Sequence, residues 1–222
     1  AVEETVRPPA RGEDALLTRA GRQALERYAT GGTVIFGVNR ASDILQVLRF
    51  AEARDINPVI MGGIEAWMVA EELAAAGAPV ILDPLRNLPG NFDTLGARLD
   101  NAALLTAAGV TVAFSAAESH NARKLRQQAG NAVSYGMPHD AALAALTINP
   151  ARIFDVARTF GSLQAGKRAD LVLWSGDPLE VTTLADLVIV NGKVDSMVSR
   201  QTLLRDRYLP ENPDMPRAYI KP

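Results

Sequence analysis

Side chains that can move protons gather in the segment that follows the apolar run at residues 110–114. Here Ser115, Glu118, His120 and Asn121 come immediately before a helix-forming segment. A carboxylate and an imidazole two positions apart can act as general base and general acid. The same two groups can instead cap the next helix or lie in solvent. This segment is the first candidate catalytic site, through Glu118 and His120, and both interpretations are open.

Other polar residues follow two further apolar runs. Arg40 comes after residues 33–38, and Asp83 and Arg86 come at the end of the run that begins at residue 79. Arginine and carboxylate side chains at such places can hold a polar substrate, so these three and Asn121 are the predicted substrate-binding residues. Asp83 and Arg86 can equally pair with each other.

Composition disfavours several other chemistries. The chain has no cysteine, which rules out disulfides, thiolate metal sites and a cysteine nucleophile. Its two histidines, His120 and His139, form no H-x-H or H-E-x-x-H pattern, although a catalytic zinc takes about three protein ligands. Ser115 lacks the G-x-S-x-G turn of a serine nucleophile, so we expect its hydroxyl to bond at the end of a strand. We expect no metal or other cofactor held by this chain itself.

The overall charge and hydropathy limit the partners. A net charge of -2 among 222 residues gives no basic surface for nucleic acid, and no apolar run approaches the length of a membrane span. We therefore expect neither nucleic-acid nor membrane partners. The start at Ala1 fits removal of a signal or pro-segment, or a fragment, and favours a periplasmic or secreted location over a cytoplasmic one.

The candidate residues follow a repeated pattern of strand, loop and helix. Each expected strand is a continuous apolar run, which is typical of strands buried on both faces of a parallel sheet. Four such units predict an α/β fold with the site at the carboxyl ends of the strands. The expected strands are residues 33–38, 57–63, 79–84 and 111–116.

The rest of the chain divides into three predicted parts. Residues 1–32 form an arm and a helix, residues 33–158 the α/β part, and residues 159–222 a small β-module and tail. The α/β part ends in a helical segment, residues 139–156, with a break expected near Pro150. In the β-module, the Asn191-Gly192 pair predicts a tight hairpin.

Three motifs in the second half resemble one known family. TINPARIFDV, GSLQAGKRADLVLWSGDPLE and LVIVNGKV are similar to the C-terminal part of the amidohydrolase superfamily, in particular its imidazolonepropionase-like members. Upstream, VNRASDI, GGIEAW, PVILDPLRNLP and GVTVAF resemble strands five to eight of that family's barrel. The resemblance implies half of a TIM-like (β/α)8 barrel with a small C-terminal β-sandwich portion.

The resemblance also implies a chemistry. Family members are metal-dependent hydrolases of C–N or related ester bonds, typically with zinc. Carried over to this sequence, the histidine of strand five falls at Gly37, the histidine of strand six at Gly62, and the aspartate after strand eight at Ala117. The segment with strands one to four and their H-x-H pair has no counterpart here. Zinc is therefore expected only if a partner chain supplies most of its ligands.

A half barrel requires something to close it, because its edge strands and apolar inner face would otherwise stay exposed. The expected partner is an N-terminal half-barrel chain or a second copy of this chain. One functional hypothesis is a hydrolase subunit or fragment that acts on a small-molecule amide or ester. The alternative is a catalytically silent homologue that serves as a binding or structural subunit. We do not expect the isolated chain to be catalytic.

Overall fold

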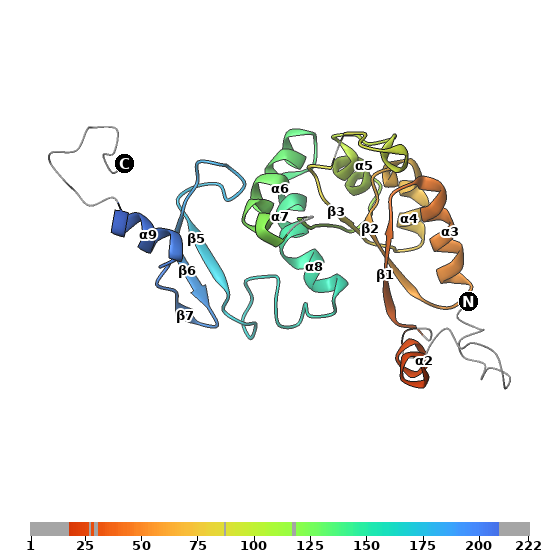
Figure 1. The fold of residues 1–222 in the computed structure, drawn as a ribbon, viewed down its shortest axis with the longest axis horizontal. Coiled ribbons are helices and arrows are strands. Elements are labelled where there is room, and N and C mark those ends of the chain that lie inside the picture. The colour runs from red at the N-terminus through yellow and green to blue at the C-terminus, as the bar shows by residue number, and fades with distance from the viewer. Residues whose placement is uncertain (1–17, 27, 29–30, 87, 117–118, 209–222) are drawn as a thin grey trace.

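The computed structural model describes residues 18–26, 28, 31–86, 88–116 and 119–208. Four parallel strands in the order β1-β2-β3-β4 form the larger sheet, and three antiparallel strands in the order β5-β6-β7 form the smaller one (Figure 1). The strands are β1 Thr33–Val38, β2 Asn57–Gly62, β3 Val80–Leu82, β4 Val112–Phe114, β5 Leu171–Trp174, β6 Ala185–Val190 and β7 Lys193–Val194.

Helical segments follow each parallel strand and confirm the four predicted β/α units. The helices are α2 Arg19–Glu26, α3 Ala41–Glu52, α4 Ala70–Ala75, α5 Asn101–Ala107, α6 Leu125–Ser134, α7 His139–Leu146, α8 Ile148–Ile153 and α9 Arg200–Tyr208. Short 3-10 turns precede three of them: η1 Ala66–Val69, η2 Phe92–Thr94 and η3 Ser119–Lys124. In the described residues, every helix is too short or too polar to cross a membrane.

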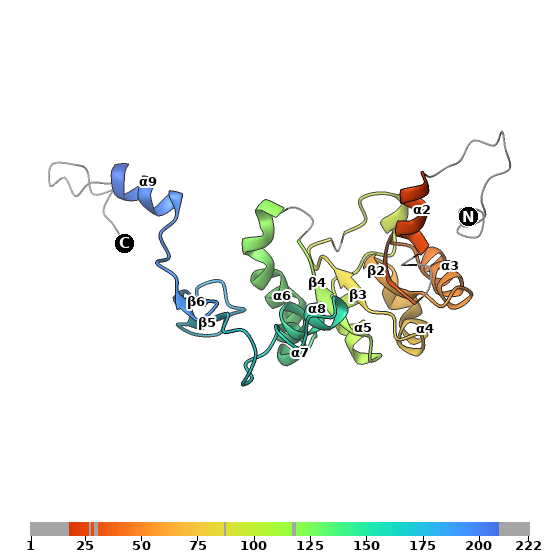
Figure 2. The ribbon, with the colours of Figure 1, turned by 90° about the horizontal axis from the view of Figure 1, so that it is seen from below.

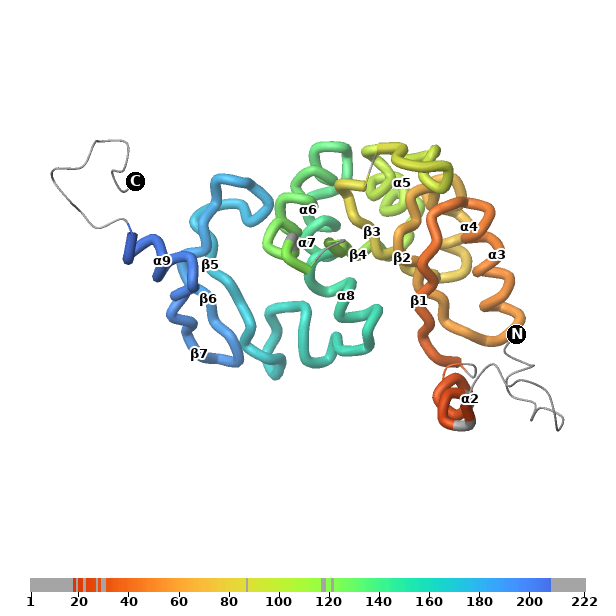
Figure 3. The backbone as a smooth tube through the Cα atoms, in the orientation of Figure 1, coloured from red at the N-terminus to blue at the C-terminus, as the bar shows by residue number. Residues whose placement is uncertain are grey.

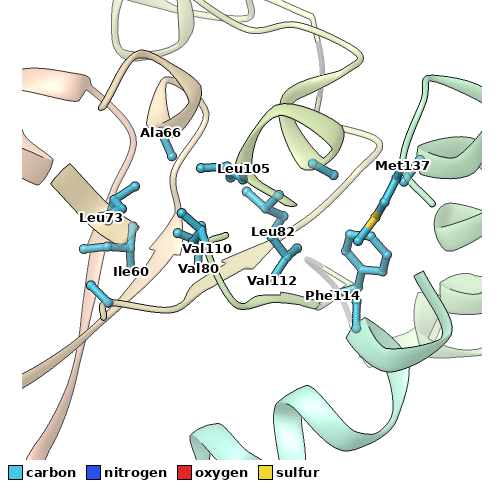
Figure 4. Close-up of a cluster of buried hydrophobic side chains, with 14 of the residues drawn as sticks. Ile60, Ala66, Leu73, Val80, Leu82, Leu105, Val110, Val112, Phe114 and Met137 are labelled. Carbon is cyan, nitrogen blue, oxygen red and sulfur yellow. The ribbon is translucent and has the colours of Figure 1, made fainter. Parts of the chain in front are cut away.

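The outer face of the parallel sheet carries the main core. Ile60, Val80 and Val112 occupy paired positions on neighbouring strands, so their side chains share one face. Leu73 of α4 and Leu105 of α5 pack on this face and are fully buried, as Figure 4 shows. Burying one such side chain stabilises the fold by about 1.5 to 3 kcal/mol. The helices therefore fix the positions of the strand ends.

The inner face of the same sheet is only partly covered. Ile153 of α8 packs against three buried residues of this face, Val59, Ile81 and Ala113. Ile35 and Met61, further along the face, remain 42% and 41% exposed. Strands of a parallel sheet are normally buried on both sides, so this face has the character of a barrel interior that lacks its opposite wall.

The break in the predicted helix 139–156 lies at Thr147, between α7 and α8, and three residues before Pro150. A proline ring collides with the carbonyl group four residues earlier, here that of Leu146. The helix therefore ends at Leu146, and Pro150 lies in the first turn of α8, where its missing N–H group costs no hydrogen bond.

The small sheet lies beyond α6 and α7, at the end of the molecule away from β1 (Figures 1 and 2). Its hairpin turns at Asn191 and Gly192, with φ values of 51° and 75°, as the Asn-Gly pair predicts. The segment between β5 and β6 contacts the α/β part through Leu179, which is 6% exposed and belongs to the main core cluster. The boundary predicted at residue 158 stays a prediction.

One arginine holds this junction together. The Nη1 atom of Arg126 on α6 donates to the carbonyl oxygens of Pro178 (3.0 Å) and Glu180 (2.6 Å), and Nη2 donates to that of Thr183 (2.9 Å). Its guanidinium also lies 5.1 Å from the ring centre of Trp174. Arg126 thus binds three carbonyl groups of the loop between β5 and β6.

Candidate site at the carboxyl ends of the parallel strands

A hollow of about 230 Å³ opens at the carboxyl ends of β2, β3 and β4. In parallel α/β folds, ligands bind at this edge of the sheet. Its walls are mainly apolar, and its polar groups come from the ends of β3 and β4. The lining residues are Met61, Gly62, Ile64, Ile81, Leu82, Asp83, Arg86, Ser115 and Ala116.

Asp83 and Arg86 lie on one turn beside this hollow. The backbone N–H of Leu85 donates to Asp83 Oδ1 at 3.0 Å, and the N–H of Arg86 donates to the Asp83 carbonyl oxygen at 3.0 Å. This Asx-type turn fixes the backbone from which the Arg86 side chain projects. Two residues predicted to bind substrate are therefore brought together at one side of the hollow.

Arg40, the third predicted binding residue, faces carboxylates of this chain. Its Nε atom lies 3.2 Å from Asp43 Oδ2 and 3.3 Å from Asp93 Oδ1. Asp43 belongs to α3 and Asp93 to η2, so the arginine links the loop after β1 to the long segment between β3 and α5. A substrate role for Arg40 stays a prediction.

Glu65, in the turn after β2, anchors the same long segment. Its Oε2 atom accepts from the N–H of Ala41 at 3.1 Å, and its Oε1 atom accepts from the N–H of Gly96 at 3.1 Å. Trp67 Nε1 donates to the Gly96 carbonyl oxygen at 2.9 Å. These partners are 24 to 31 positions away in sequence, beyond the reach of local patterns. The segment between β3 and α5, yellow to yellow-green in Figure 3, is thereby held at the carboxyl ends of the parallel strands, which we call the mouth.

Ser115 lies at the end of β4. Its N–H donates to the Leu82 carbonyl oxygen at 2.8 Å, and its hydroxyl donates to that of Ala116 at 3.3 Å. The hydroxyl is thus part of the strand end, as expected for a residue without a nucleophile motif.

Gly62 has a backbone that disfavours any other residue. Its φ is +101°, a region that residues with a Cβ atom rarely adopt. A Cβ built on Gly62 would lie 2.5 Å from Asn39 Oδ1 and 3.1 Å from the Val38 carbonyl oxygen. By contrast, a Cβ built on Gly37 would meet nothing within 4 Å. Of the two positions at which the resemblance places histidine ligands, Gly37 is open and Gly62 is closed.

The closed conformation at Gly62 is braced from the neighbouring chain segments. The N–H of Gly63 donates to the Val38 carbonyl oxygen at 2.7 Å. Asn101, 8% exposed, donates from Nδ2 to the carbonyl oxygens of Gly63 (2.9 Å) and Ile64 (3.3 Å). Relaxing the turn to admit a larger side chain would break these bonds.

The predicted catalytic pair is only partly described by the structure. Ala117 and Glu118 lie outside the described residues. His120 is exposed in η3, and Asn121 lies in the same turn. The roles proposed for Glu118, His120 and Asn121 therefore stay predictions.

The side chains at this edge do not suit a catalytic metal. Across residues 18–208, apart from the few positions that the structure leaves undescribed, no three His, Cys, Asp or Glu side chains are grouped closely enough to hold a metal ion. Glycine at positions 37 and 62 offers no donor atom, and Gly62 has no room for one. The described part of the chain does not fit the usual zinc centre of the family.

His139 takes part in a contact that no local sequence pattern marks, because its partner lies 38 positions away. Its Nε2 atom lies 2.9 Å from Asp177 Oδ2, across the junction between α7 and the β5–β6 segment. The backbone N–H of Leu179 donates to Asp177 Oδ1 at 2.9 Å. This hydrogen bond, followed by the one from His139, lowers the pKa of the Asp177 carboxyl. His139 begins α7 with 41% of its side chain exposed, and its contact with Asp177 joins two parts of the chain.

Comparisons with known proteins agree with this architecture. The amidohydrolase family model matches residues 95–200. The amidohydrolase tasK of Hapsidospora irregularis is 36% identical over 72 residues, which are 32% of this chain and 7% of that protein.

Solved structures extend the comparison to most of the chain. An amidohydrolase from Thermotoga maritima MSB8 superimposes with a TM-score of 0.74 and 29% identity, over 83% of this chain and 49% of that one. An adenosine deaminase from Xanthomonas campestris with bound zinc shares the fold, with a TM-score of 0.57 and 18% identity over 85% of this chain and 52% of that one. This chain thus spans about half the length of these structures.

The α/β fold, with its partial barrel and small β-module, the family match and the Thermotoga structure agree with the resemblance seen in the sequence motifs. The chain belongs to the amidohydrolase superfamily.

Proposed function

We propose that this chain forms one half of an amidohydrolase-type barrel that hydrolyses a C–N amide or related ester bond of a small molecule. The observation that carries the proposal is the hollow at the carboxyl ends of β2 to β4, at the edge where parallel α/β enzymes bind substrate. Membership of a hydrolase superfamily supports it. Fold alone does not give function, so the argument rests on this site.

The other half of the barrel comes from further β/α units. The partial exposure of Ile35 and Met61 on the inner face supports this, as does the 49% of the Thermotoga protein that the chain covers. The partner is an N-terminal half-barrel chain or a second copy of this chain. Only the first could restore the family's full set of eight different units.

Within the assembly, this chain holds the substrate and leaves the metal to its partner. Arg86 and Asp83 flank the hollow, and Glu118 and His120 are the groups proposed to transfer protons beside it. Zinc, where present, is bound mainly by the other half, because positions 37 and 62 are glycine in this one.

A second function is favoured by one observation, the closed turn at Gly62. The Asn39 side chain fills the space into which a ligand at position 62 would project. A strand end without space for a metal ligand is consistent with a catalytically silent homologue that serves as a binding or structural subunit.

The two functions are separated by native mass spectrometry of the undenatured full chain, isolated from cells that produce it, with amide and lactone hydrolysis measured on the same sample. The first function requires a complex of unequal chains, or a longer polypeptide, that carries metal and hydrolyses one of these substrates. A metal-free monomer or homodimer without hydrolysis contradicts it and supports the silent subunit.

A further inference from the structure

We propose that the hollow at the mouth binds the carboxylate group of a small ligand with an apolar body, and that Arg86 is the group that recognises it. This inference rests on the proposed function, because it assigns a substrate class to the same site. It follows from the guanidinium group of Arg86 and from the apolar walls and the size of the hollow.

Arg86 differs from the other arginines around the mouth. Arg98 is engaged by the two carboxylate oxygens of Asp100, which raises the pKa of the guanidinium, and Arg40 lies against Asp43 and Asp93. In the described part of the chain, Arg86 has no ion pair or side-chain hydrogen bond. Its five N–H donors are therefore available to a ligand.

The planar guanidinium selects the ligand group. Arginine binds carboxylates through two parallel charge-assisted hydrogen bonds, which fix the direction of the ligand as well as its charge. The turn at Asp83 orients the backbone of Arg86 at the edge of the hollow, where the side chain lines its wall. A carboxylate bound there would direct the rest of the ligand along the strand ends.

The apolar walls select the body of the ligand. Ile64, Ile81 and Leu82 are buried, and Met61 presents a flexible apolar side chain to the hollow. Methionine adapts to ligands of different shape. The volume, about 230 Å³, lies just below the roughly 300 Å³ at which ordinary ligand pockets begin, so the body is small. An N-acylated aliphatic amino acid combines these properties.

The test compares two probes that differ only in the terminal group, a charged carboxylate or a neutral amide. N-acetyl-L-leucine carries the carboxylate, and N-acetyl-L-leucinamide replaces it with a neutral amide. Binding of each to the full chain is measured by calorimetry at neutral pH and moderate salt. We expect the carboxylate to bind at least about tenfold more tightly than the amide, as charge-assisted hydrogen bonds require.

Two variants assign the effect to Arg86. The Arg86→Gln variant should bind both probes equally weakly, whereas Arg158→Gln, which removes an exposed arginine outside the hollow, should retain the wild-type preference. Circular dichroism and thermal unfolding check that each variant is folded.

The inference is overturned by equal affinity of the wild-type chain for both probes, by failure of both to bind, or by unchanged preference in Arg86→Gln. Failure of the proposed function is recognised separately. The chain could show a carboxylate preference that depends on Arg86 and yet neither assemble with a barrel half nor hydrolyse any amide or ester. That result would contradict the proposed hydrolase function and support the binding site.

Discussion

Asn39 Oδ1 lies 2.5 Å from the point at which a Cβ atom on Gly62 would stand. A side chain at position 62 must displace Asn39 and also adopt a φ near +101°, which costs about 1 to 3 kcal/mol by itself. We predict that Gly62→His lowers the free energy of unfolding by at least about 2 kcal/mol. Urea unfolding followed by circular dichroism measures it.

Gly37→His is the matched control, because the space around Gly37 is open. It should change stability by less than about 1 kcal/mol. In the Gly62→Ala background, Asn39→Ala should recover the stability that is lost through the clash with the Asn39 side chain. The loss caused by the unfavourable φ at position 62 should remain. Equal stability of Gly62→His and Gly37→His would contradict the closed turn.

Arg126 is predicted to bind the β5–β6 segment to the α/β part. Arg126→Ala removes three hydrogen bonds from a charged group to carbonyl oxygens, together with the contact over Trp174. We expect a loss of about 1.5 to 3 kcal/mol of stability and faster amide hydrogen exchange around Thr183. Hydrogen exchange detected by mass spectrometry locates the change.

The neighbouring arginine provides the comparison for this variant. Arg123 in η3 is exposed, and Arg123→Ala should leave exchange in residues 175–184 unaltered. If Arg126→Ala accelerates exchange evenly over the whole chain, the arginine stabilises the fold in general. The prediction that it holds the β5–β6 segment locally would then be wrong.

The hydrogen bonds of Asp177 with the N–H of Leu179 and with His139 predict an acid-sensitive junction. Because the pKa of Asp177 is lowered below its ordinary value of 3.8, its ionised form stabilises the fold above that pH, and this stabilisation is lost as the pH falls through the lowered value. Asp177→Asn should therefore destabilise the chain at neutral pH, and the difference from wild type should shrink below about pH 4. Unfolding midpoints measured from pH 3 to pH 7 test this.

Asp140→Asn is suitable as the control, since Asp140 is fully exposed and lies 3.9 Å from the other ring nitrogen of His139. It leaves the hydrogen bonds of Asp177 in place and should therefore keep the acid-dependent loss of stability of the wild type. A constant difference between Asp177→Asn and wild type over the whole pH range would contradict a role of the Asp177 carboxylate in the junction. Asp100, whose pKa is lowered by its hydrogen bond with Arg98, keeps some acid sensitivity in both variants.

The proposed proton-transfer and binding loops can be tested in the proposed hydrolase assembly. Glu118→Gln, His120→Ala and Asp83→Asn should each lower kcat/KM at least about tenfold if these groups act on the substrate. Glu71→Gln on the exposed side of α4 is the control and should leave kcat/KM unchanged. Unchanged rates in all three loop variants would favour the silent subunit.

The strands were predictable because their signal is local. The continuous apolar run Thr33–Val38 matches β1 at both ends, and all four parallel strands follow in the expected order. β3 is shorter than the predicted residues 79–84, since Pro79 and Pro84 flank it and neither has an N–H group for the ladder. Sequence alone could place the candidate site at this edge.

The contacts that shape the site could not be predicted in the same way. Glu65 bonds to groups 24 and 31 positions away, and Arg126 to carbonyls 52 to 57 positions away. Backbone N–H and carbonyl groups are present at every residue other than proline, so nothing in the residue types marks which of them such a side chain will reach. The closed turn at Gly62 depends in turn on Asn39 and Asn101, which local patterns do not connect.

Leu179, buried among the side chains that pack on the parallel sheet, has a consequence for the history of such chains. Gly130 of α6 leaves room for the Leu179 carbonyl oxygen, which a Cβ there would approach to 2.6 Å. A recombination event that joined the barrel half to a foreign C-terminal segment before residue 184 would leave a gap in the barrel's own core. Exchange between relatives is therefore expected to carry residues 175–184 together with the β/α units, and chimeras made in the laboratory should be joined after them.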